Sequence, residues 1–394
     1  MPFDRSVALA CGGLAAMATA LGIGRFVYTP ILPAMLGALH WSKADAGLVA
    51  SANLLGYFVG AMLAGHSLVA ARARFWLLVA LAVSAVSTAA MAAPSDIASF
   101  AALRFIGGIA SAFVIVCAST LVLERLALAG RGSLSAVHFA GVGTGIMISA
   151  ISVSTTLASG GGWRSLWIGA GALALLAAII AAWLIPAAKN VTAPQRPNPV
   201  SSGPSRSGPM VVAYGLFGFG YVITATFLVT IVRATDAVRG LEPWVWVLVG
   251  LAAIPSVAFW TRLGARIGAM NAFAIACVIE AIGVGASVEW LTIPGVCVSA
   301  LLLGGTFMGL TALGFMAARI LSSENLHQAF GRMTASFSIG QMVGPTLAGF
   351  LSEHSGSFRL ASLIAAAALM LAAALAVWTS RATEKDRLAA ANGA

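Results

Sequence analysis

Charged residues are scarce in this sequence. Of its 394 residues only 9% are Asp, Glu, Lys or Arg, whereas 60% are hydrophobic and the mean hydropathy is +0.97. Because soluble domains carry about 25% charged residues, this composition excludes an ordinary soluble protein. The net charge of +10 does not indicate nucleic-acid binding, because the basic residues are spread over short connections and form no single patch.

The sequence is also poor in the patterns that build catalytic and metal sites. The four cysteines lie in apolar segments without CxxC or Cys/His spacing, which favours packing residues over a disulfide or a zinc site. The glycine run at 141–145 has no strand before it and is therefore no nucleotide-binding loop. Without a catalytic triad, paired catalytic carboxylates or a P-loop, we expect no enzyme, no catalytic residue, no cofactor and no metal.

Apolar runs of about 20 residues fill most of the chain, and each is long enough to cross a bilayer as a helix. They are too uniformly apolar to be the alternating strands of a barrel. The sequence therefore predicts an all-α membrane protein with twelve transmembrane helices. The expected spans are residues 7–36, 46–70, 75–93, 97–123, 132–157, 165–185, 210–232, 244–260, 270–288, 292–318, 331–352 and 358–379.

The spans fall into two groups of six. We expect an N-terminal six-helix bundle over 1–185, a Pro/Ser-rich linker over 186–209, a C-terminal six-helix bundle over 210–380 and a tail over 381–394. Most arginines and lysines lie in the connections on the side of the termini, so the positive-inside rule predicts that both termini, the linker and the tail are cytoplasmic. The apolar N-terminal run is expected to be a retained span and not a signal peptide.

The two halves repeat one pattern. Gly22-Ile23-Gly24-Arg25-Phe26 returns 196 residues later as Gly218-Phe219-Gly220-Tyr221. Six spans repeated in the same orientation give two halves related by an axis along the membrane normal, with a substrate site between them at the midplane. Only the first copy carries a permanent positive charge at this point of the repeat.

These motifs resemble the major facilitator superfamily over essentially the whole chain. Arg104 followed by Gly107-Gly108 resembles the basic motif of that family's fourth helix, and the glycines of the fifth and eleventh spans resemble its gating motif. The segments most similar to the YbfB/YjiJ branch are 24–30, 53–57, 138–143 and 340–345. The resemblance implies two six-helix bundles related by a pseudo-twofold axis. We expect a multi-pass protein of the bacterial cell inner membrane.

Arg25 is the main candidate for substrate binding. An arginine within hydrocarbon costs at least about 2.5–3.5 kcal/mol, so its usual explanation is functional. Its guanidinium could hold a carboxylate, sulfonate or phosphate in bidentate geometry. The alternative is an arginine that snorkels to the interface or is paired structurally. Pro30 and Pro33 predict a bend in the upper part of this span, which leaves the depth of Arg25 open.

Three more ionisable residues lie within spans and are candidates for proton coupling. Arg104 would assist coupling or substrate binding, as the resemblance implies, or would donate to backbone carbonyls of a neighbouring helix. His138 could carry a proton because imidazole titrates near neutral pH, or it could be a packing residue. Glu280 is the only acid near the middle of a span, although the ninth span of this fold is usually peripheral.

Uncharged polar residues on the spans that line the cavity in the resembling family form a second group of candidates. They contact substrate if they face the cavity, and otherwise join helices through contacts worth about 0.6 kcal/mol each. The candidates for substrate contact are Asn53, Tyr57, Tyr221 and Gln341. Small residues would allow the helices to rearrange during gating, and these are Gly141, Gly143, Gly145, Gly344 and Pro345. We interpret Trp244 and Trp246 as anchors at the membrane interface.

The sequence thus predicts a secondary active transporter that moves a small organic solute, an anion such as a carboxylate, by alternating access. Import of an anion against a negative interior costs about 2.3 kcal/mol per 100 mV, so uptake would require proton symport or exchange. The expected partners are the substrate, protons and membrane lipids, without nucleic acid, and we expect a monomer. The alternatives are a proton-driven exporter of aromatic or amphipathic drugs and a membrane sensor that has a transporter fold.

Overall fold

The structure is a computed structural model that describes residues 4–186, 207–321 and 326–392. Within these ranges the chain forms helices and no strand. The first half contains α1 (Arg5–Met17), the π-helix η1 (Ala18–Ile23), α2 (Tyr28–Leu39), α3 (Lys43–Ala64), α4 (Ser67–Ala71), α5 (Ala73–Ala90), α6 (Ile97–Leu128), the short η2 (Gly132–Leu134), α7 (Ser135–Ala158) and α8 (Trp163–Leu184). The second half contains α9 (Gly208–Ala234), η3 (Asp236–Leu241), α10 (Glu242–Ile267), α11 (Ala269–Glu289), α12 (Ile293–Leu321), α13 (Leu326–Ser355) and α14 (Arg359–Asn392).

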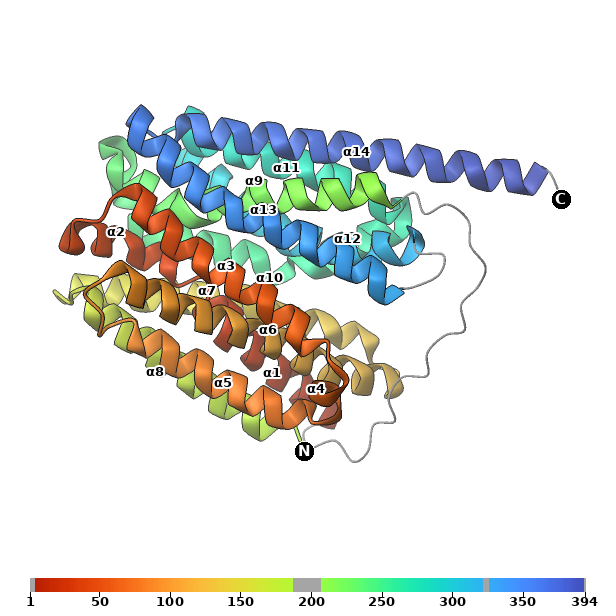
Figure 1. Ribbon diagram of the computed structural model, residues 1–394, viewed down its shortest axis with the longest axis horizontal. Coiled ribbons are helices and arrows are strands. Elements are labelled where there is room, and N and C mark those ends of the chain that lie inside the picture. The colour runs from red at the N-terminus through yellow and green to blue at the C-terminus, as the bar shows by residue number, and fades with distance from the viewer. Residues whose placement is uncertain (1–3, 187–206, 322–325, 393–394) are drawn as a thin grey trace.

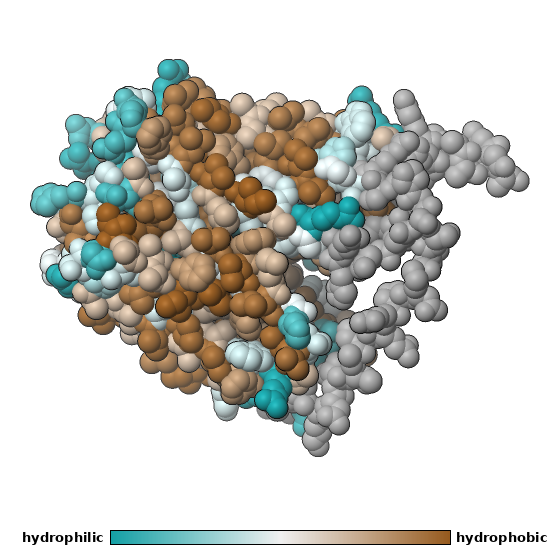
Figure 2. Space-filling model, in the orientation of Figure 1, coloured by the Kyte–Doolittle hydropathy of each residue, from teal (hydrophilic) through white to brown (hydrophobic). Residues whose placement is uncertain are grey.

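Eleven spans among the described residues are long and apolar enough to cross a membrane, and the first of them joins α1, η1 and α2. The 30-residue helix α13 is more polar and completes the expected set of twelve. Hydrophobic side chains cover the middle of the molecular face in Figure 2, whereas hydrophilic ones gather toward its ends. The predicted all-α membrane protein is therefore confirmed.

Two bundles, α1–α8 and α9–α14, lie side by side. In Figure 1, α1, α5, α6 and α8 lie in the lower part and α9, α11, α13 and α14 in the upper part. They meet through three pairs of helices: α3 packs on α13, α7 on α10, and α2 on α9. The predicted linker lies mostly outside the described residues, and α9 already begins at Gly208. Residues 381–392, predicted as a tail, continue α14 as a helix.

Local sequence signals explain several helix ends. Ser42 and Asp45 form a capping box at the start of α3, in which each side chain bonds the other residue's backbone N–H. Asp96 caps α6 by accepting a hydrogen bond from Ser99 N at 2.9 Å. This bond stabilises the ionised carboxylate and therefore lowers the pKa of Asp96.

The first span is broken in its middle, at residues 24–27. Pro30 has no N–H to donate to Phe26 O, which instead accepts a bond from Thr29 N at 3.3 Å. Thr29 N therefore does not donate to Arg25 O, which would be its hydrogen-bond partner in a regular α-helix. The prolines predict a bend in the upper part of the span, and the break lies one turn before Pro30.

The turn before the break is wound as a π-helix. Gly24 N bonds Thr19 O at 2.9 Å and Phe26 N bonds Leu21 O at 3.1 Å, which are i→i−5 bonds. Such wider turns are frequent at functional sites. The break and the π-helix together free the carbonyl groups of Gly24 and Arg25 for partners outside their own helix.

Several hydrogen bonds between described residues of the two bundles lie at the end of the molecule away from the termini. Ser51 Oγ donates to Met342 O at 2.7 Å, and Lys43 N donates to Glu353 Oε2 at 3.0 Å. Where α7 packs on α10, Ser154 Oγ donates to Pro243 O at 3.0 Å. We call this end the sealed end. The opposite half of the first span, α1 and η1, packs chiefly on α5–α8 of its own bundle.

Candidate functional site

Two contacts between the bundles join positions that are equivalent in the sequence repeat. Arg25 Nη2 donates to Tyr221 Oη at 3.2 Å, and Thr29 Oγ1 donates to Ala225 O at 2.6 Å. The partners of each pair are 196 residues apart, which is the offset of the repeat. Residues related by a twofold axis can touch only where both lie close to that axis. The pseudo-twofold axis therefore passes beside Arg25, at the centre of the molecule.

Arg25 is buried between the bundles, with 7% of its surface exposed. Its guanidinium lies 5.1 Å from the centre of the Tyr57 ring and 5.2 Å from that of Phe26, which are cation–π distances. Apart from the bond to Tyr221, its side chain makes no hydrogen bond or ion pair with a described residue. A fixed positive charge thus lies on the axis without an acidic partner in the described part of the chain.

Tyr221 is the hub of this cluster. Its phenol oxygen accepts hydrogen bonds from both Arg25 and Gln341 Nε2. Its ring stacks on Phe307 at 5.8 Å and on Phe337 at 6.0 Å. Because the acceptor atom of the amide, Gln341 Oε1, is buried without a hydrogen-bond partner among the described residues, this side chain can still accept a hydrogen bond.

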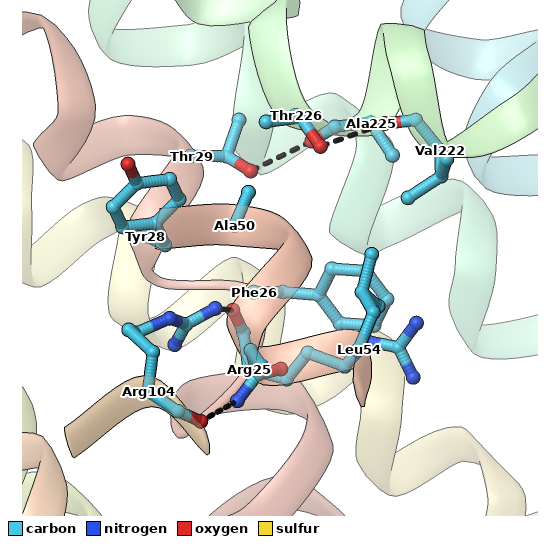
Figure 3. Close-up of a pocket in the computed structure, with 11 residues that line it drawn as sticks. Arg25, Phe26, Tyr28, Thr29, Ala50, Leu54, Arg104, Val222, Ala225 and Thr226 are labelled. Atoms are coloured by element: carbon cyan, nitrogen blue, oxygen red, sulfur yellow. Dashed lines mark hydrogen bonds between the residues drawn. The ribbon is translucent and has the colours of Figure 1, made fainter. Parts of the chain in front are cut away.

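Arg104 binds backbone and does not face the same way as Arg25. Its two terminal nitrogens donate to Gly24 O at 2.9 Å and to Arg25 O at 3.0 Å. These are the carbonyls that the break in the first span sets free. Asn53 Nδ2 donates to Arg104 O at 2.8 Å, so both residues hold the broken segment in place. Figure 3 shows the guanidinium of Arg104 turned toward this segment and that of Arg25 turned away from it.

A small cavity lies between these groups and α9. Its volume is about 30 Å³, which is room for one or two water molecules and not for an organic solute. The residues that line it include Arg25, Thr29, Asn53, Arg104 and Thr226. The buried atom Asn53 Oδ1 has no partner among the described residues. The site is therefore assembled but closed in this conformation.

A larger hollow of about 380 Å³ lies at the sealed end, lined by residues of both bundles. Arg233 and Glu242 form an ion pair in its wall, with 3.3 Å between Nη1 and Oε1. Trp246 lines the same hollow and is 1% exposed, packed 6.5 Å from the Phe26 ring. The expectation that Trp246 is an interfacial anchor is wrong, whereas the neighbouring Trp244 is 60% exposed.

The two candidate proton carriers lie apart from each other. His138 is buried in the N-terminal bundle, where Nε2 lies 3.2 Å from Ser119 Oγ and Nδ1 has no partner among the described residues. A Cβ on Gly13 would lie 2.3 Å from His138 Nδ1, so the imidazole fills the space that this glycine leaves. Glu280 is fully buried on α11 in the other bundle. No hydrogen bond between described residues joins His138 to Arg25.

The glycines predicted to serve gating lie at close helix contacts. A Cβ on Gly141 would meet Leu14 O at 2.1 Å, and one on Gly145 would meet Gly22 Cα at 2.8 Å, both within one bundle. Gly143 instead faces α10 of the other bundle, where a Cβ would lie 2.6 Å from Gly250 O.

The corresponding residues of α13 behave in the same way. A Cβ on Gly344 would lie 2.7 Å from a side-chain carbon of Val222. A Cβ on Gly47 of α3 would lie 2.3 Å from Pro345 O, so this contact joins the two bundles. Gly143 and Pro345 are thus the gating candidates that lie at the interface between the bundles.

Sequence reasoning missed several residues that complete the site. Thr29 bridges the bundles, and the rings of Phe26, Phe307 and Phe337 surround the Arg25–Tyr221 pair. The sequence did contain a signal for Thr29. This residue lies in the segment 24–30 that resembles the YbfB/YjiJ branch, and the offset of the repeat pairs it with Ala225. The phenylalanines carry no such signal in a chain of this hydrophobicity.

A family model described as "Uncharacterised MFS-type transporter YbfB" matches residues 17–377. The crystal structure of the nucleoside transporter NupG is similar, with a TM-score of 0.68 and 15% identity, over 96% of this chain and 99% of that one. A mutant form of NupG gives 0.66 and 16% over the same shares. At such identities the two structures establish a common fold alone.

Proposed function

Because the chain belongs to the family of uncharacterised YbfB-type transporters in the major facilitator superfamily, we propose that it moves a small organic anion, such as a carboxylate, across the membrane. The chain is a multi-pass membrane protein and a secondary transporter by its family. The anion would bind at the central cluster, which we define as Arg25, Tyr57, Tyr221 and Gln341.

The unpaired charge of Arg25 carries this proposal. A guanidinium buried near the pseudo-twofold axis, with no acid beside it among the described residues, lacks within that part of the chain the counter-ion that buried charges normally have. An anionic substrate would supply that counter-ion through charge-assisted hydrogen bonds, each worth about 1.5–3 kcal/mol. The N-terminus of α2 begins just after Arg25, and its dipole adds to the preference for an anion.

The other members of the cluster would shape and orient the ligand. Tyr57 supports the guanidinium from one bundle, while Tyr221 and Gln341 reach it from the other. Arg104 and Asn53, expected to touch substrate, have a positioning role in this proposal, because their hydrogen bonds go to backbone atoms of the broken span and of α6.

The direction of access follows from the sealed end. If the termini are cytoplasmic in a bacterial inner membrane, as the basic connections indicate, the bundles are closed on the outer side and substrate would exchange with the cytoplasm. The hollow at the sealed end would then be the remnant of the outward path. Proton symport or exchange would offset the membrane potential during uptake.

A second candidate substrate is a neutral planar solute. The stacked rings of Tyr221, Phe307 and Phe337 offer flat apolar walls, and Gln341 could bind the edge of a base. The structurally similar NupG is described as a nucleoside transporter. This candidate leaves the charge of Arg25 unexplained, so we rank it below the anion.

A ligand screen separates these possibilities. Purified protein is heated with benzoate, acetate, inorganic phosphate, uridine or a cationic dye, and the unfolding temperature is recorded. We expect stabilisation by a carboxylate that is lost in Arg25→Ala and weakened in Arg25→Lys, since lysine keeps the charge without the bidentate fork. Stabilisation by uridine alone would favour the neutral solute, and by the dye alone the drug exporter. Counterflow in proteoliposomes then distinguishes a transporter from a sensor.

A further inference from the structure

Helix α10 presents a hollowed face to the outside of its bundle. Ser256 Oγ and Trp260 Nε1 both donate to Gly305 O of α12, at 2.8 and 2.7 Å, and Gly250 packs against Gly143 of α7. Since successive residues of a helix turn by about 100°, these contacts occupy one side of α10. The other side surrounds a hollow of about 370 Å³. The residues that line it are Pro255, Ala258, Phe259, Arg262, Leu263 and Arg266.

This stripe of residues joins an apolar part to two positive charges. The Phe259 side chain is 58% exposed, whereas Trp260 beside it is 3% exposed, so the stripe points out of the protein. Arg262 and Arg266 lie four residues apart on the same face, and both are exposed. Neither makes a hydrogen bond or an ion pair with a described residue, and the sequence has no acidic residue from 243 to 279. Two positive charges therefore border the hollow without a counter-ion in the described part of the chain.

The hollow lies in the half of the molecule opposite the sealed end. Helix α10 begins at the sealed end, where Pro243 O accepts the bond from Ser154 Oγ, and Arg266 lies in its last turn. From Pro255 to Arg266 the helix rises about 16 Å, which is close to half of a hydrocarbon core of about 30 Å. The apolar part of the stripe thus runs beside the acyl chains of one leaflet, and the two arginines reach the level of its headgroups.

We propose that this hollow binds one anionic phospholipid. Its phosphate would accept hydrogen bonds from Arg262 and Arg266, because guanidinium groups bind phosphate in bidentate geometry. One acyl chain would lie along Ala258 and Phe259. In the orientation that the basic connections indicate, this is the cytoplasmic leaflet, where anionic lipids give the membrane surface a negative potential. The site is separate from the central cluster and does not depend on the identity of the transported solute.

A second copy of the chain fits this face less well than a lipid does. Helices that associate within membranes meet through small residues, which let their backbones approach closely, whereas the stripe carries Phe259 and Leu263. In a twofold dimer the same patch meets itself, so Arg262 and Arg266 would lie close to their like-charged copies. An anionic lipid instead matches the apolar hollow with its chain and the two charges with its headgroup.

Native mass spectrometry of the full-length protein tests the site, with dioleoylphosphatidylglycerol and dioleoylphosphatidylcholine as probes. We expect the wild type to retain one molecule of the anionic lipid in preference to the zwitterionic one. In the double variant Arg262→Gln with Arg266→Gln, affinity for the anionic lipid should fall on the order of tenfold, while affinity for the zwitterionic lipid should not change. The matched control is Arg72→Gln with Arg381→Gln. It removes two exposed arginines that do not line the hollow, and it should retain the wild-type affinity.

A phosphatidylglycerol with a photoactivatable group on its acyl chain locates the site in the wild type, which covers the case that the double variant does not fold. Cross-links should lie within residues 255–266. Cross-links elsewhere, or an equal loss of affinity in the control variant, would overturn the proposal.

Inorganic phosphate has the charge of the headgroup without an acyl chain, so it should not raise the unfolding temperature as the anionic lipid does. Equal stabilisation by the two would mean that the arginines bind ions and that the hollow is no lipid site. Dimers that disappear only in the double variant Arg262→Gln with Arg266→Gln would assign this face to a second copy of the chain and would contradict the lipid.

Discussion

At the scale of single residues, the phenol oxygen of Tyr221 is the most consequential atom of the site. It accepts hydrogen bonds from Arg25 and Gln341, so Tyr221→Phe would leave two buried donors without an acceptor while keeping the stacked ring. A buried donor left unsatisfied costs about 1–3 kcal/mol. We expect a lower free energy of unfolding by about that amount, measured by denaturation in detergent, together with weaker benzoate binding because Arg25 loses its orientation.

Tyr57→Phe is the matched control for that variant. The Tyr57 ring also lies against Arg25, but its hydroxyl makes no hydrogen bond with a described residue. Its removal should leave the unfolding free energy within about 0.5 kcal/mol of the wild type, as for sites without a special contact. Equal losses in the two variants would show that the hydroxyl of Tyr221 is not the group that matters.

Sequence reasoning found the charged residues of the site but not all of their roles. Arg25, Arg104 and Glu280 stand out because charge is costly within an apolar span. That Arg104 binds the backbone could not be predicted, because its acceptors exist only where the first span breaks. Trp246 was misjudged because a tryptophan suits both a membrane interface and a buried aromatic cluster.

At the scale of elements, the break in the first span decides how the site is built. Pro30 removes one N–H and predicts a disturbance one turn earlier. The sequence does not predict the π-helix before it, because η1 depends on close packing between Gly22 and Gly145, which are far apart in the chain. A regular helix would pair the carbonyls that Arg104 now holds, and Arg25 would then lie on a rigid helix face.

The contact of α7 with α10 provides a test at the same scale. A Cβ at Gly143 would lie 2.6 Å from both Gly250 O and Ile254 N, which are backbone atoms and cannot turn aside. Gly143→Ala should therefore push α7 and α10 apart and destabilise this conformation by about 1–3 kcal/mol, as overpacking does. If the separation extends along α7 to the sealed end, a cysteine placed at Ser154, which lines the hollow at that end, should react faster with an impermeant thiol reagent.

Gly285→Ala is the control, because a Cβ on Gly285 of α11 would meet no atom within 4 Å. Without a steric penalty, alanine should raise the unfolding free energy by up to about 1 kcal/mol through its better helix propensity. The two substitutions are chemically identical and have opposite predicted signs. A stabilised Gly143→Ala protein would mean that the α7–α10 contact is not tight.

At the scale of the whole molecule, the repeat predicted more than the number of helices. An offset of 196 residues pairs Arg25 with Tyr221 and Thr29 with Ala225, and both pairs are in contact across the axis. The repeat in the sequence thus predicts which residues lie next to the pseudo-twofold axis. It could not specify which end is closed, because a transporter that alternates between two states must encode both in one set of interfaces.

The sealed end can be locked to test whether it opens during transport. Ser51 and Thr346 lie on α3 and α13, on opposite sides of the interface, and their hydroxyl oxygens are 2.8 Å apart. Sulfur atoms at these places could approach the bonding distance of about 2.0 Å with little movement. In a double variant, Ser51→Cys with Thr346→Cys, we expect oxidation to stop substrate counterflow in proteoliposomes and reductant to restore it.

Each single variant should stay active under the same treatment. Benzoate should still bind the oxidised protein, because the disulfide joins the bundles at the sealed end alone and leaves the opposite end free to open and admit it. Counterflow that continues at the wild-type rate, with the disulfide verified by mass, would mean that the bundles do not separate at this end.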